Sequence, residues 1–398
     1  MSARDTTAGS VPATETAGTN AQAKAAGPSD ARVGAATAHA PARPGAARVA
    51  RVAVLGASGY SGQEFVRLAL GHPGIEIALL VSREHAGQPA AGMLPGLDPR
   101  VLDVGEVVAP DALAARLERG AFDTLVCCLP HGAWRTLASE SKALAGGPAH
   151  IVDLSSDFRP EATYGGGGNG SGAAQHAGYV YGLPEAFRRS LAGATRIANP
   201  GCYPTAAALA LLPAAEDGWL AGPVMVSALS GVSGAGRAAA LRTSFVELDG
   251  GASIYRAGDV HPHAAEMERS LARLAGVPLP VGFAPQLVPM ARGILLTANV
   301  QLARAVSPEE ARAAYAARYA NEPFVRVLGE GVWPETRAVR GSNRCDVAVT
   351  TLHGGRTLLA TAAIDNLVKG AAGQAVQNLN LMLGWPETQG LAAHGSPW

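Results

Sequence analysis

Arg51-Val-Ala-Val-Leu55 runs directly into Gly56-Ala-Ser-Gly-Tyr-Ser-Gly62, and this stretch decides the fold class. Its first five residues carry the short, largely apolar run typical of a buried strand, and its glycines indicate a turn. Gln63 to Leu70 follows as a predicted helix, and Ile75 to Val81 as a second strand. A strand, helix and strand within about 30 residues predict a βαβ unit and a parallel sheet.

Further strand candidates indicate two different sheets. Thr124 to Leu129 and Ile151 to Leu154 are short apolar strands that extend the parallel sheet, and each ends in turn residues. After Cys202 the candidates have little helix between some of them, which favours a mixed or antiparallel sheet. They are Val224 to Leu229, Gly282 to Val288, Ile294 to Leu302, Cys345 to Leu352 and Thr357 to Ile364. We therefore expect an α/β protein in which a Rossmann-like, doubly wound domain is joined to a mixed-sheet α/β catalytic domain.

The expected domains follow from shifts in composition. Residues 1–48 are rich in Ala, Thr, Gly and Pro without periodic apolar residues, which predicts a disordered extension; its acidic residues disfavour a transit peptide. Residues 49–201 form the expected dinucleotide-binding domain, completed by a C-terminal helix within 365–398, and 202–364 form the catalytic and oligomerisation domain. We also expect a surface loop at Gly165 to Gly172 and a capped helix at Ser307 to Tyr319.

Composition excludes several classes of protein. The 398 residues contain 32 Lys plus Arg and 32 Asp plus Glu, so no net charge attracts nucleic acid or an acidic membrane. No apolar run has the length of a transmembrane helix, and the N-terminus lacks the apolar core of a signal peptide. Four cysteines without a CxxC pair favour reduced thiols and no zinc site. These features predict a cytoplasmic enzyme without a metal.

The glycine turn is a candidate dinucleotide site because it follows a strand and opens a helix. Small residues let backbone N–H groups approach a pyrophosphate, and the helix N-terminus favours the negative charge. Gly56, Gly59 and Gly62 depart from the GxGxxG spacing, so an ordinary glycine-rich turn remains the alternative.

The end of the second strand bears on the choice between NAD and NADP. An NAD site usually has an acidic residue there for the ribose 2′-hydroxyl. This chain has Ser82-Arg83, a hydroxyl and a guanidinium suited to a 2′-phosphate, although Glu84 follows directly. We expect NADP.

Asn199-Pro-Gly-Cys202-Tyr-Pro-Thr205 indicates a nucleophile. The prolines and glycine predict a turn, followed by an Ala- and Leu-rich helix that ends near Leu212-Pro213. Cys202 would then lie at the helix start, where free N–H groups and the helix dipole favour thiolate. The alternative is a buried, inert cysteine, which suits Cys127 and Cys128 within their apolar strand.

Gly258-Asp-Val-His-Pro-His-Ala-Ala-Glu266 contains the candidate acid/base. A thiolate that exchanges acyl groups beside a nicotinamide needs a proton carrier, and histidine is the usual one. His263 has Glu266 three residues later, a carboxylate suited to orienting its ring. A solvated loop and a His-x-His metal pair are the alternatives, and the metal pair lacks further ligands.

Many further motifs occur in one order along the chain. With the two turns quoted above, they are Leu129-Pro-His-Gly132, Asp153-Leu-Ser-Ser-Asp-Phe-Arg159, Tyr181-Gly-Leu-Pro-Glu185, Ser230-Gly-Val-Ser-Gly-Ala-Gly-Arg237, Val288-Pro-Met-Ala-Arg-Gly293, Gly341-Ser-Asn343 and Asp365-Asn-Leu-Val-Lys-Gly-Ala-Ala-Gly-Gln374. From Arg51 to Leu383 the chain resembles the N-acetyl-γ-glutamyl-phosphate reductases of arginine biosynthesis, within the aspartate-semialdehyde dehydrogenase group.

This resemblance implies that Cys202 attacks an acyl phosphate and that NADPH reduces the resulting thioester to a semialdehyde. It implies proton transfer by His263, with Glu266 as a possible orienting group, and a homodimer or homotetramer. The expected cofactor contacts are Gly56, Ser58, Gly59, Tyr60, Ser61, Gly62, Ser82, Arg83, Pro130 and Asn366. The expected substrate contacts are Asn199, His261, Arg237 and Arg292, although either arginine could instead be a plain surface or structural residue.

One segment departs from the family pattern. The family usually has His-Arg-His-x-Pro-Glu, whereas Pro262 and Ala265 stand here for the Arg and the Pro. The histidines and glutamate keep their spacing, but a missing arginine would alter how substrate charge is bound. Two other functions stay open: reduction of a related acyl phosphate (aminoadipyl or aspartyl phosphate), and a nucleotide-binding regulator without catalysis.

Overall fold

The computed structural model describes residues 49–94, 96, 104–160 and 178–395. The predicted extension at residues 1–48 and the predicted loop at Gly165 to Gly172 lie outside this range. In the part that is described, no helix is long and apolar enough to cross a membrane.

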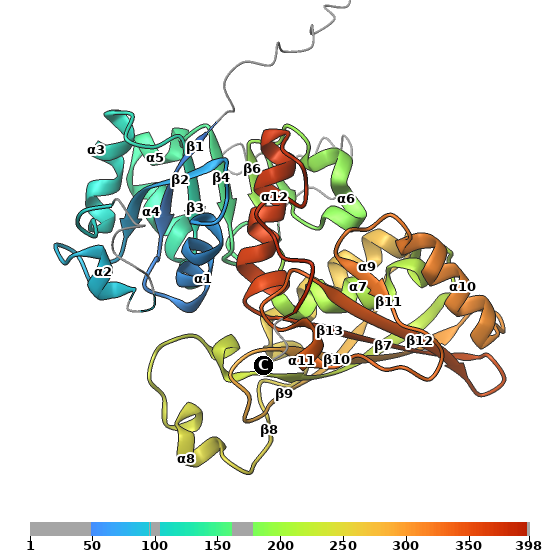
Figure 1. The fold of residues 1–398 in the computed structure, drawn as a ribbon. Helices are drawn as coiled ribbons and strands as arrows, with labels where there is room; N and C mark the ends of the chain where they lie inside the picture. Colours follow the sequence, from blue (N-terminus) through green and yellow to red (C-terminus); the bar gives the residue numbers. More distant parts are fainter. Residues whose placement is uncertain (1–48, 95, 97–103, 161–177, 396–398) are drawn as a thin grey trace, which may run out of the picture. The chain divides into compact units, whose positions relative to one another are not determined.

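The first sheet has six strands among the described residues, all parallel, in the order β2-β1-β3-β4-β6-β5. Its strands are β1 (Ala50–Leu55), β2 (Ile75–Val81), β3 (Thr124–Cys127), β4 (His150–Asp153), β5 (Tyr179–Tyr181) and β6 (Arg196–Ala198), blue to green in Figure 1. The chain goes from β1 to β2 and then crosses to β3 on the other side of β1. In doubly wound sheets the crevice at such a reversal binds the ligand. The first sheet therefore has the predicted class and offers a site after β1 and β3.

Helices accompany this sheet in the order of the chain. They are α1 (Tyr60–Ala69), α2 (Ala90–Met93), α3 (Leu113–Glu118), α4 (Ala133–Glu140), α5 (Lys142–Gly146) and α6 (Pro184–Leu191). α1 begins at Tyr60, earlier than the predicted Gln63, because Gly59 keeps an extended backbone and acts as its N-cap. Phe65 and Val66 on its inner face are fully buried, so α1 is fixed against the sheet by apolar packing.

The second sheet is mixed, as predicted, with seven strands in the described residues in the order β11-β12-β13-β10-β7-β9-β8. Its strands are β7 (Leu220–Ser230), β8 (Ser253–Ile254), β9 (Val281–Leu287), β10 (Ile294–Leu302), β11 (Val325–Val327), β12 (Cys345–Leu352) and β13 (Thr357–Ile364). β10 pairs antiparallel with β7 and β13, whereas β7 pairs parallel with β9. The five predicted strands are present, and the two that were not predicted, β8 and β11, are very short.

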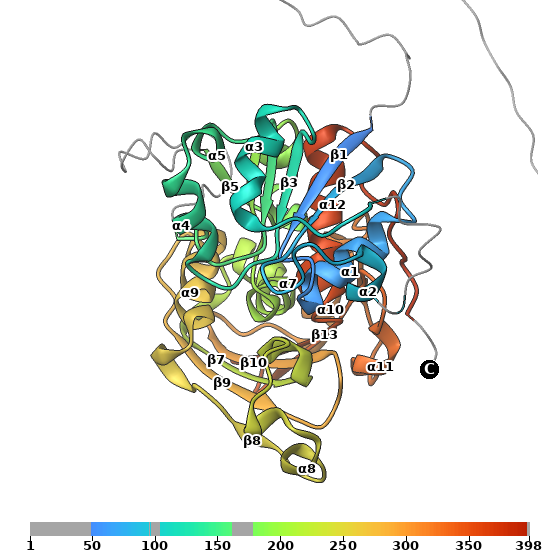
Figure 2. The ribbon, with the colours of Figure 1, turned by 90° about the vertical axis from the view of Figure 1, so that its left-hand side faces the viewer.

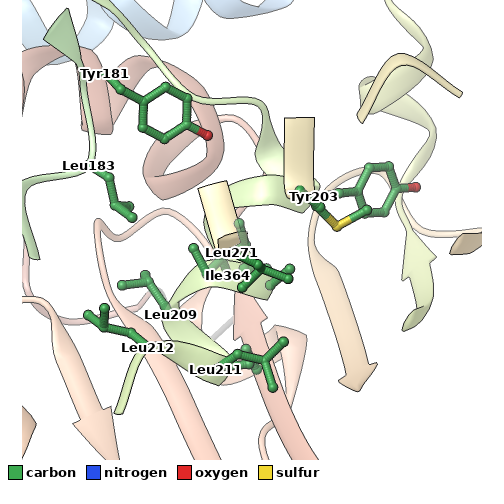
Figure 3. Packing of buried hydrophobic residues seen from close by; sticks show 14 of the residues in the cluster. Tyr181, Leu183, Tyr203, Leu209, Leu211, Leu212, Leu271 and Ile364 are labelled. Carbon is green, nitrogen blue, oxygen red and sulfur yellow. The ribbon is translucent and has the colours of Figure 1, made fainter. Parts of the chain in front are cut away.

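Helix α7 (Cys202–Glu216) contacts β10, β12 and β13 of this sheet, and it is accompanied by α8 (Phe245–Leu248), α9 (Pro262–Ala275), α10 (Pro308–Tyr319) and α11 (Thr336–Val339). Every side chain of α7 from Tyr203 to Ala215 is buried, as expected for a core helix that is apolar on all sides. Figure 3 shows its Leu209, Leu211 and Leu212 together with Leu271 of α9 and Ile364 of β13. The core of the catalytic half is thus built around the helix that Cys202 begins.

The predicted end of α7 near Pro213 is wrong, because the helix continues to Glu216. Proline lacks the N–H that would bond to the carbonyl four residues earlier. The Tyr319 hydroxyl of α10 donates to that carbonyl, the Leu209 oxygen, at 2.5 Å. The predicted start of α10 is correct: Pro308 is its first residue and the Ser307 hydroxyl accepts the Glu310 N–H at 3.2 Å.

The last helical segment has two parts, a π-helical turn at Val368–Ala372 and α12 (Gly373–Leu383). α12 packs against β4 of the first sheet and against α1 and α6. Figure 1 draws it in red next to β4 and α6, and Figure 2 shows it beside the first sheet. The predicted continuous helix from Leu367 is therefore interrupted by a wider turn. This turn contacts α7 directly.

Candidate active site

A cavity of about 1070 Å³ opens at the carboxyl ends of β1 and β3 and reaches the start of α7. This volume exceeds the roughly 300–1,000 Å³ usual for one drug-sized ligand. Most of the predicted site residues line it: Gly56, Ser58, Gly59, Tyr60, Ser61, Ser82, Arg83, Pro130, Asn199, Cys202, Arg237, His263 and Asn366. Four predicted residues do not line it, namely Gly62, His261, Glu266 and Arg292.

The glycine turn has a backbone that only glycine suits at two positions. Gly56 has φ +83°, and a Cβ there would lie 2.5 Å from the Cys128 carbonyl oxygen. A Cβ on Gly62 would collide with the Gly56 carbonyl oxygen, so Gly62 packs the helix onto the turn from outside the cavity. No side chain in the described ranges caps α1, which leaves its first N–H groups for a ligand. These features fit a dinucleotide phosphate at the helix start.

Three polar groups gather beside this turn. The Ser82 hydroxyl donates to the Ser58 hydroxyl at 3.0 Å, and Arg83 follows with an exposed side chain. The Arg237 guanidinium, expected at the substrate, donates instead to the Ser58 carbonyl at 2.7 Å. Arg237 therefore lies at the dinucleotide turn.

Cys202 is the first residue of α7, as predicted, with Gly201 as N-cap. The expected low pKa of its thiol is wrong. Burial raises the pKa to about 11, and the N–H groups of Tyr203 and Cys202 and the charge of Arg159 lower it only in part. The helix start stabilises thiolate as expected, but the loss of solvation is the larger effect.

His263, near the start of α9, lies against the turn that precedes the cysteine. A Cβ on Gly201 would be 2.5 Å from His263 Nε2, so glycine is needed there for the ring to fit. Burial, followed by the charge of Arg159, holds the His263 pKa well below its usual range. Its buried Nδ1 has no hydrogen-bond partner among the described residues. The imidazole is therefore neutral and able to accept a proton.

Glu266, which was expected to orient His263, holds the backbone before Cys202. Its Oε1 accepts the Gly201 N–H at 2.9 Å and the Tyr181 hydroxyl at 2.8 Å. Its Oε2 accepts a hydrogen bond from Arg159 at 3.0 Å, and both side chains are buried. Glu266 thus fixes the turn of the nucleophile.

Arg159 is a site residue that was not predicted. It lines the cavity, and its Nε and Nη2 donate to the carbonyls of Asn199 at 2.7 Å and Leu154 at 2.6 Å. The available signal was its place in the quoted motif after β4, at the carboxyl edge of a parallel sheet. Arg159 is the cation that lowers the pKa values of both Cys202 and His263.

His261 has a structural role at the start of α9. Its Nδ1 accepts the His263 N–H at 3.1 Å, so its side chain caps the helix. Pro262, which stands where the family usually has arginine, is the first helical residue, a position that proline favours. His261 lies outside the cavity lining, and the departure at Pro262 strengthens the helix start.

The remaining predicted residues make contacts within the protein. Arg292 is paired with Glu64 at 3.0 Å and Asp365 at 2.8 Å, so it is not a free partner for a substrate anion. Asn199 donates to the Ala371 carbonyl at 3.3 Å, and its oxygen accepts from Asn378 at 2.9 Å. The Asn366 side chain bonds to the Gly293 N–H and the Ser233 hydroxyl while facing the cavity.

Metal binding has no support in this region. In the ranges that the structure covers, no group of three or more His, Cys, Asp or Glu side chains is arranged to hold a metal ion.

Solved structures with the same fold are aspartate-semialdehyde dehydrogenases. Aspartate semialdehyde dehydrogenase II from Vibrio cholerae, complexed with ASA, superposes with a TM-score of 0.64 at 17% identity over 85% of this chain and 99% of that one. The enzyme from Candida albicans with NADP gives 0.62 at 18% identity, over 84% and 98%. At these identities the likeness establishes the fold.

Sequence comparisons establish the family. The family model "Semialdehyde dehydrogenase, NAD binding domain" matches residues 51–194, and "Semialdehyde dehydrogenase, dimerisation domain" matches 202–366. An N-acetyl-γ-glutamyl-phosphate reductase from Mycobacterium avium is 44% identical over 364 residues, covering 88% of this chain and 99% of its own. One from Geobacter sp. is 42% identical over 351 residues, covering 86% and 97%. The chain, with its nicotinamide-dinucleotide-binding domain, therefore belongs to the N-acetyl-γ-glutamyl-phosphate reductase family of semialdehyde dehydrogenases.

Proposed function

We propose that the protein reduces N-acetyl-γ-glutamyl phosphate to N-acetylglutamate semialdehyde and phosphate with NADPH, through a thioester on Cys202. The observation that carries the proposal is that a cysteine at a helix start and a neutral histidine line one cavity with the glycine turn of Gly56 and Gly59. In this proposal residues 49–201 and 365–398 bind the cofactor, and residues 202–364 supply the acid/base and self-association.

The first step is transfer of the Cys202 proton to His263. The thiol is protonated at neutral pH because burial raises its pKa to about 11. A bound acyl phosphate brings negative charge to the cavity, which favours the protonated form of His263, while the N–H groups at the start of α7 stabilise the thiolate against that same charge. The thiolate then forms a bond to the acyl carbon, and the bond from that carbon to the phosphate oxygen breaks. Phosphate leaves and a thioester remains on Cys202.

The second half returns the protein to its starting state. A nicotinamide cofactor held at the glycine turn would supply the hydride that reduces the acyl carbon. The carbon–sulfur bond breaks as the aldehyde carbonyl forms, and the Cys202 thiolate takes its proton back from His263. Glu266 and Arg159 hold the Asn199–Cys202 turn throughout, so the sulfur stays in one place.

Arg159 is the cation that we assign to the anionic substrate. Its guanidinium is paired with Glu266, but it lines the cavity next to the nucleophile turn, whereas Arg292 lies outside the cavity lining and Arg237 lies at the glycine turn. A fixed positive charge in a partly closed cavity stabilises both the acyl phosphate and the negative charge that develops at the acyl carbon. Arg237 then has a different proposed role, beside the cofactor phosphates at the start of α1.

We assign NADP as the cofactor on the strength of Ser58, Ser82 and Arg83. The two hydroxyls are hydrogen-bonded to each other, and Arg83 is exposed beside them at the cavity. A guanidinium and hydroxyls suit a 2′-phosphate, which a ribose 2′-hydroxyl lacks.

The functional unit that we propose is a homodimer, or a homotetramer built from it. Exposed apolar side chains gather in the segment after β7, within the residues matched by the dimerisation domain. They are Leu241, Phe245, Val246, Ile254 and Val260. Large apolar side chains exposed close together in the sequence favour an interface in this segment. Phe245→Glu combined with Val246→Glu is expected to release monomers in sedimentation experiments; an unchanged mass would place the interface elsewhere.

The direct test is the reverse reaction. N-acetylglutamate semialdehyde, phosphate and NADP should yield NADPH with the wild-type protein, and the Cys202→Ser variant should lose the activity. Cys128→Ser is the matched control, since Cys128 also faces the cavity but its pKa is raised further by burial in apolar surroundings. Full activity of Cys202→Ser would exclude the covalent mechanism.

The same assay separates the other functions. Turnover of aspartate semialdehyde or aminoadipate semialdehyde at equal or higher kcat/KM would change the assigned substrate but not the proposed mechanism. No turnover of any of the three semialdehydes, with NADP binding retained, would indicate a regulator without catalysis.

A further inference from the structure

Lys369 and Glu185 form an ion pair in the protein interior, away from the cavity lining. Neither side chain is exposed at all, and Lys369 Nζ donates to Glu185 Oε1 at 2.7 Å. Gln377 completes the cluster: its Oε1 accepts from Lys369 at 2.7 Å and its Nε2 donates to Glu185 at 3.2 Å. Removing two charges from water is costly, and such a pair contributes little net stability compared with apolar residues of the same size. Its presence therefore calls for a role in specifying geometry.

The backbone beside Lys369 supplies that role. Lys369 lies within the π-helical turn Val368–Ala372, and the next residue, Gly370, packs directly on the nucleophile. A Cβ on Gly370 would lie 2.8 Å from the Cys202 Cβ. The carbonyl of Ala371 accepts the hydrogen bond from Asn199, at the other end of the nucleophile turn. The π-helical turn thus packs against both ends of the nucleophile turn, Asn199 and Cys202.

Two ion pairs hold the N-terminal side of this π-helical turn. Asp365, just before it, accepts the Leu367 and Val368 N–H groups and pairs with Arg292. Lys369, its second residue, is tied to Glu185 near the start of α6. Without the Lys369–Glu185 pair, we expect the π-helical turn to relax toward α-helical geometry, because such turns are single-turn departures from the α-helix.

We infer that the Lys369–Glu185 ion pair positions the nucleophile, by holding Gly370 and Ala371 against Cys202 and Asn199. The inference rests on the proposed covalent role of Cys202. Lys369 touches neither the cavity nor the sulfur, so it acts through the backbone. Its charge is balanced by Glu185, whose own pKa it keeps low against burial, and it is not among the charges that set the pKa of the Cys202 thiol.

The test is the double variant Lys369→Met/Glu185→Gln, which removes both charges and leaves no buried ion without a partner. We expect kcat of the reverse reaction to fall about tenfold to a hundredfold, as misplacement of a reacting atom by about 1 Å does. KM for NADP should stay within about twofold because the glycine turn is untouched, and the pH midpoint of Cys202 alkylation should not move. A kcat within about twofold of wild type would overturn the inference.

Asp346→Asn is the matched control. Asp346 is also buried and paired, with Arg326 at 2.6 Å and Arg344 at 2.9 Å, but it lies on β12. It should lose stability to heat without losing kcat, and an equal fall in kcat in both variants would mean that Lys369 matters only for folding.

A second variant covers the case in which the double variant does not fold. Glu185→Asp keeps both charges and withdraws the carboxylate by one methylene, and the same split between kcat and KM is expected. Wild-type kcat in this variant would contradict the inference. If instead Cys202→Ser is active, it is the proposed function that fails.

Discussion

The helices α1 and α7 both begin at the cavity, but their first residues have different surroundings. α1 follows Gly56 to Gly59 and begins with Tyr60 and Ser61 on the cavity lining, with no side-chain cap in the described structure. α7 follows Asn199-Pro-Gly201 and is buried from its second residue onward. At α1 we propose that the backbone N–H groups themselves form the binding surface for the cofactor phosphates. At α7 the reactive group is a side chain, the Cys202 thiol, and its surroundings set its protonation state.

The difference teaches that a helix start alone does not make a reactive thiol. The N–H groups at the start of α7 lower the Cys202 pKa, yet burial raises it to about 11. In a buried site the proton has to be taken by a partner, and His263, held neutral by burial, is that partner in our account. A helix start that faces a cavity can bind an anion with its own N–H groups. A nucleophile at a buried helix start needs a base to remove its proton.

The largest expected effect separates the two histidines at the start of α9. His263→Asn should lower kcat of the reverse reaction by about 10²- to 10⁴-fold, because the proton acceptor is lost. His261→Asn is the matched control, since asparagine is a good N-cap and can replace the bond from His261 Nδ1 to the His263 N–H. Steady-state kinetics measures both. A comparable loss in both variants would contradict the assignment of His263.

The next prediction tests the start of α1. Gly62→Ala should raise KM for NADPH by about tenfold or more, because its Cβ would collide with the Gly56 carbonyl and displace the turn. Gly71→Ala, at the far end of the same helix, has 3.7 Å to its nearest neighbour and should leave KM unchanged. Equal KM values for Gly62→Ala and wild type would show that the turn does not bind the cofactor.

A smaller effect should distinguish the two forms of the cofactor. Arg83→Ala is expected to raise KM for NADPH by about tenfold, the cost of one charge-assisted contact of roughly 1.5 kcal/mol, and to leave KM for NADH almost unchanged. Glu84→Ala serves as the control at the neighbouring exposed position. The assignment of NADP is contradicted if Arg83→Ala affects both cofactors alike.

The smallest expected effect concerns the charges that set the pKa of the Cys202 thiol. The Glu266 charge raises the Cys202 pKa, so Glu266→Gln should lower it from about 11, and alkylation by iodoacetamide should begin at lower pH. The glutamine oxygen can still accept the Gly201 N–H, which keeps the turn in place. Glu309→Gln on the surface of α10 should leave the alkylation profile unchanged. An unshifted profile for Glu266→Gln would show that this charge does not act on the thiol.

The start of α1 was predictable from the sequence. For the start of α7, the sequence predicted the cysteine and its position but not its surroundings. Strand, glycines and helix are contiguous at Gly56 to Gly62, so local pattern indicates both the fold class and the binding surface. Cys202 and His263 were identified from local motifs as well. The environment of Cys202 was not, because Arg159, Tyr181 and Glu266 come from other parts of the chain and only the fold brings them together.

Residues far away in the sequence also decided what was left open or predicted wrongly. Arg292 was left open between a substrate contact and a structural residue, and the two carboxylate partners that favour the structural role lie 228 and 73 residues away. The end of α7 was misplaced because the donor that compensates for Pro213 belongs to Tyr319, 110 residues from the carbonyl it serves. Burial and long-range partners decide such cases, and neither is visible in a local pattern.

The most direct measurement is mass spectrometry of the protein after brief exposure to N-acetyl-γ-glutamyl phosphate with no nicotinamide cofactor. Our account predicts that the peptide containing Cys202 gains the mass of an N-acetylglutamyl group, that hydroxylamine removes it, and that Cys202→Ser shows no gain. A protein that turns over this substrate but carries the acyl group on another residue, or on none, would contradict the account.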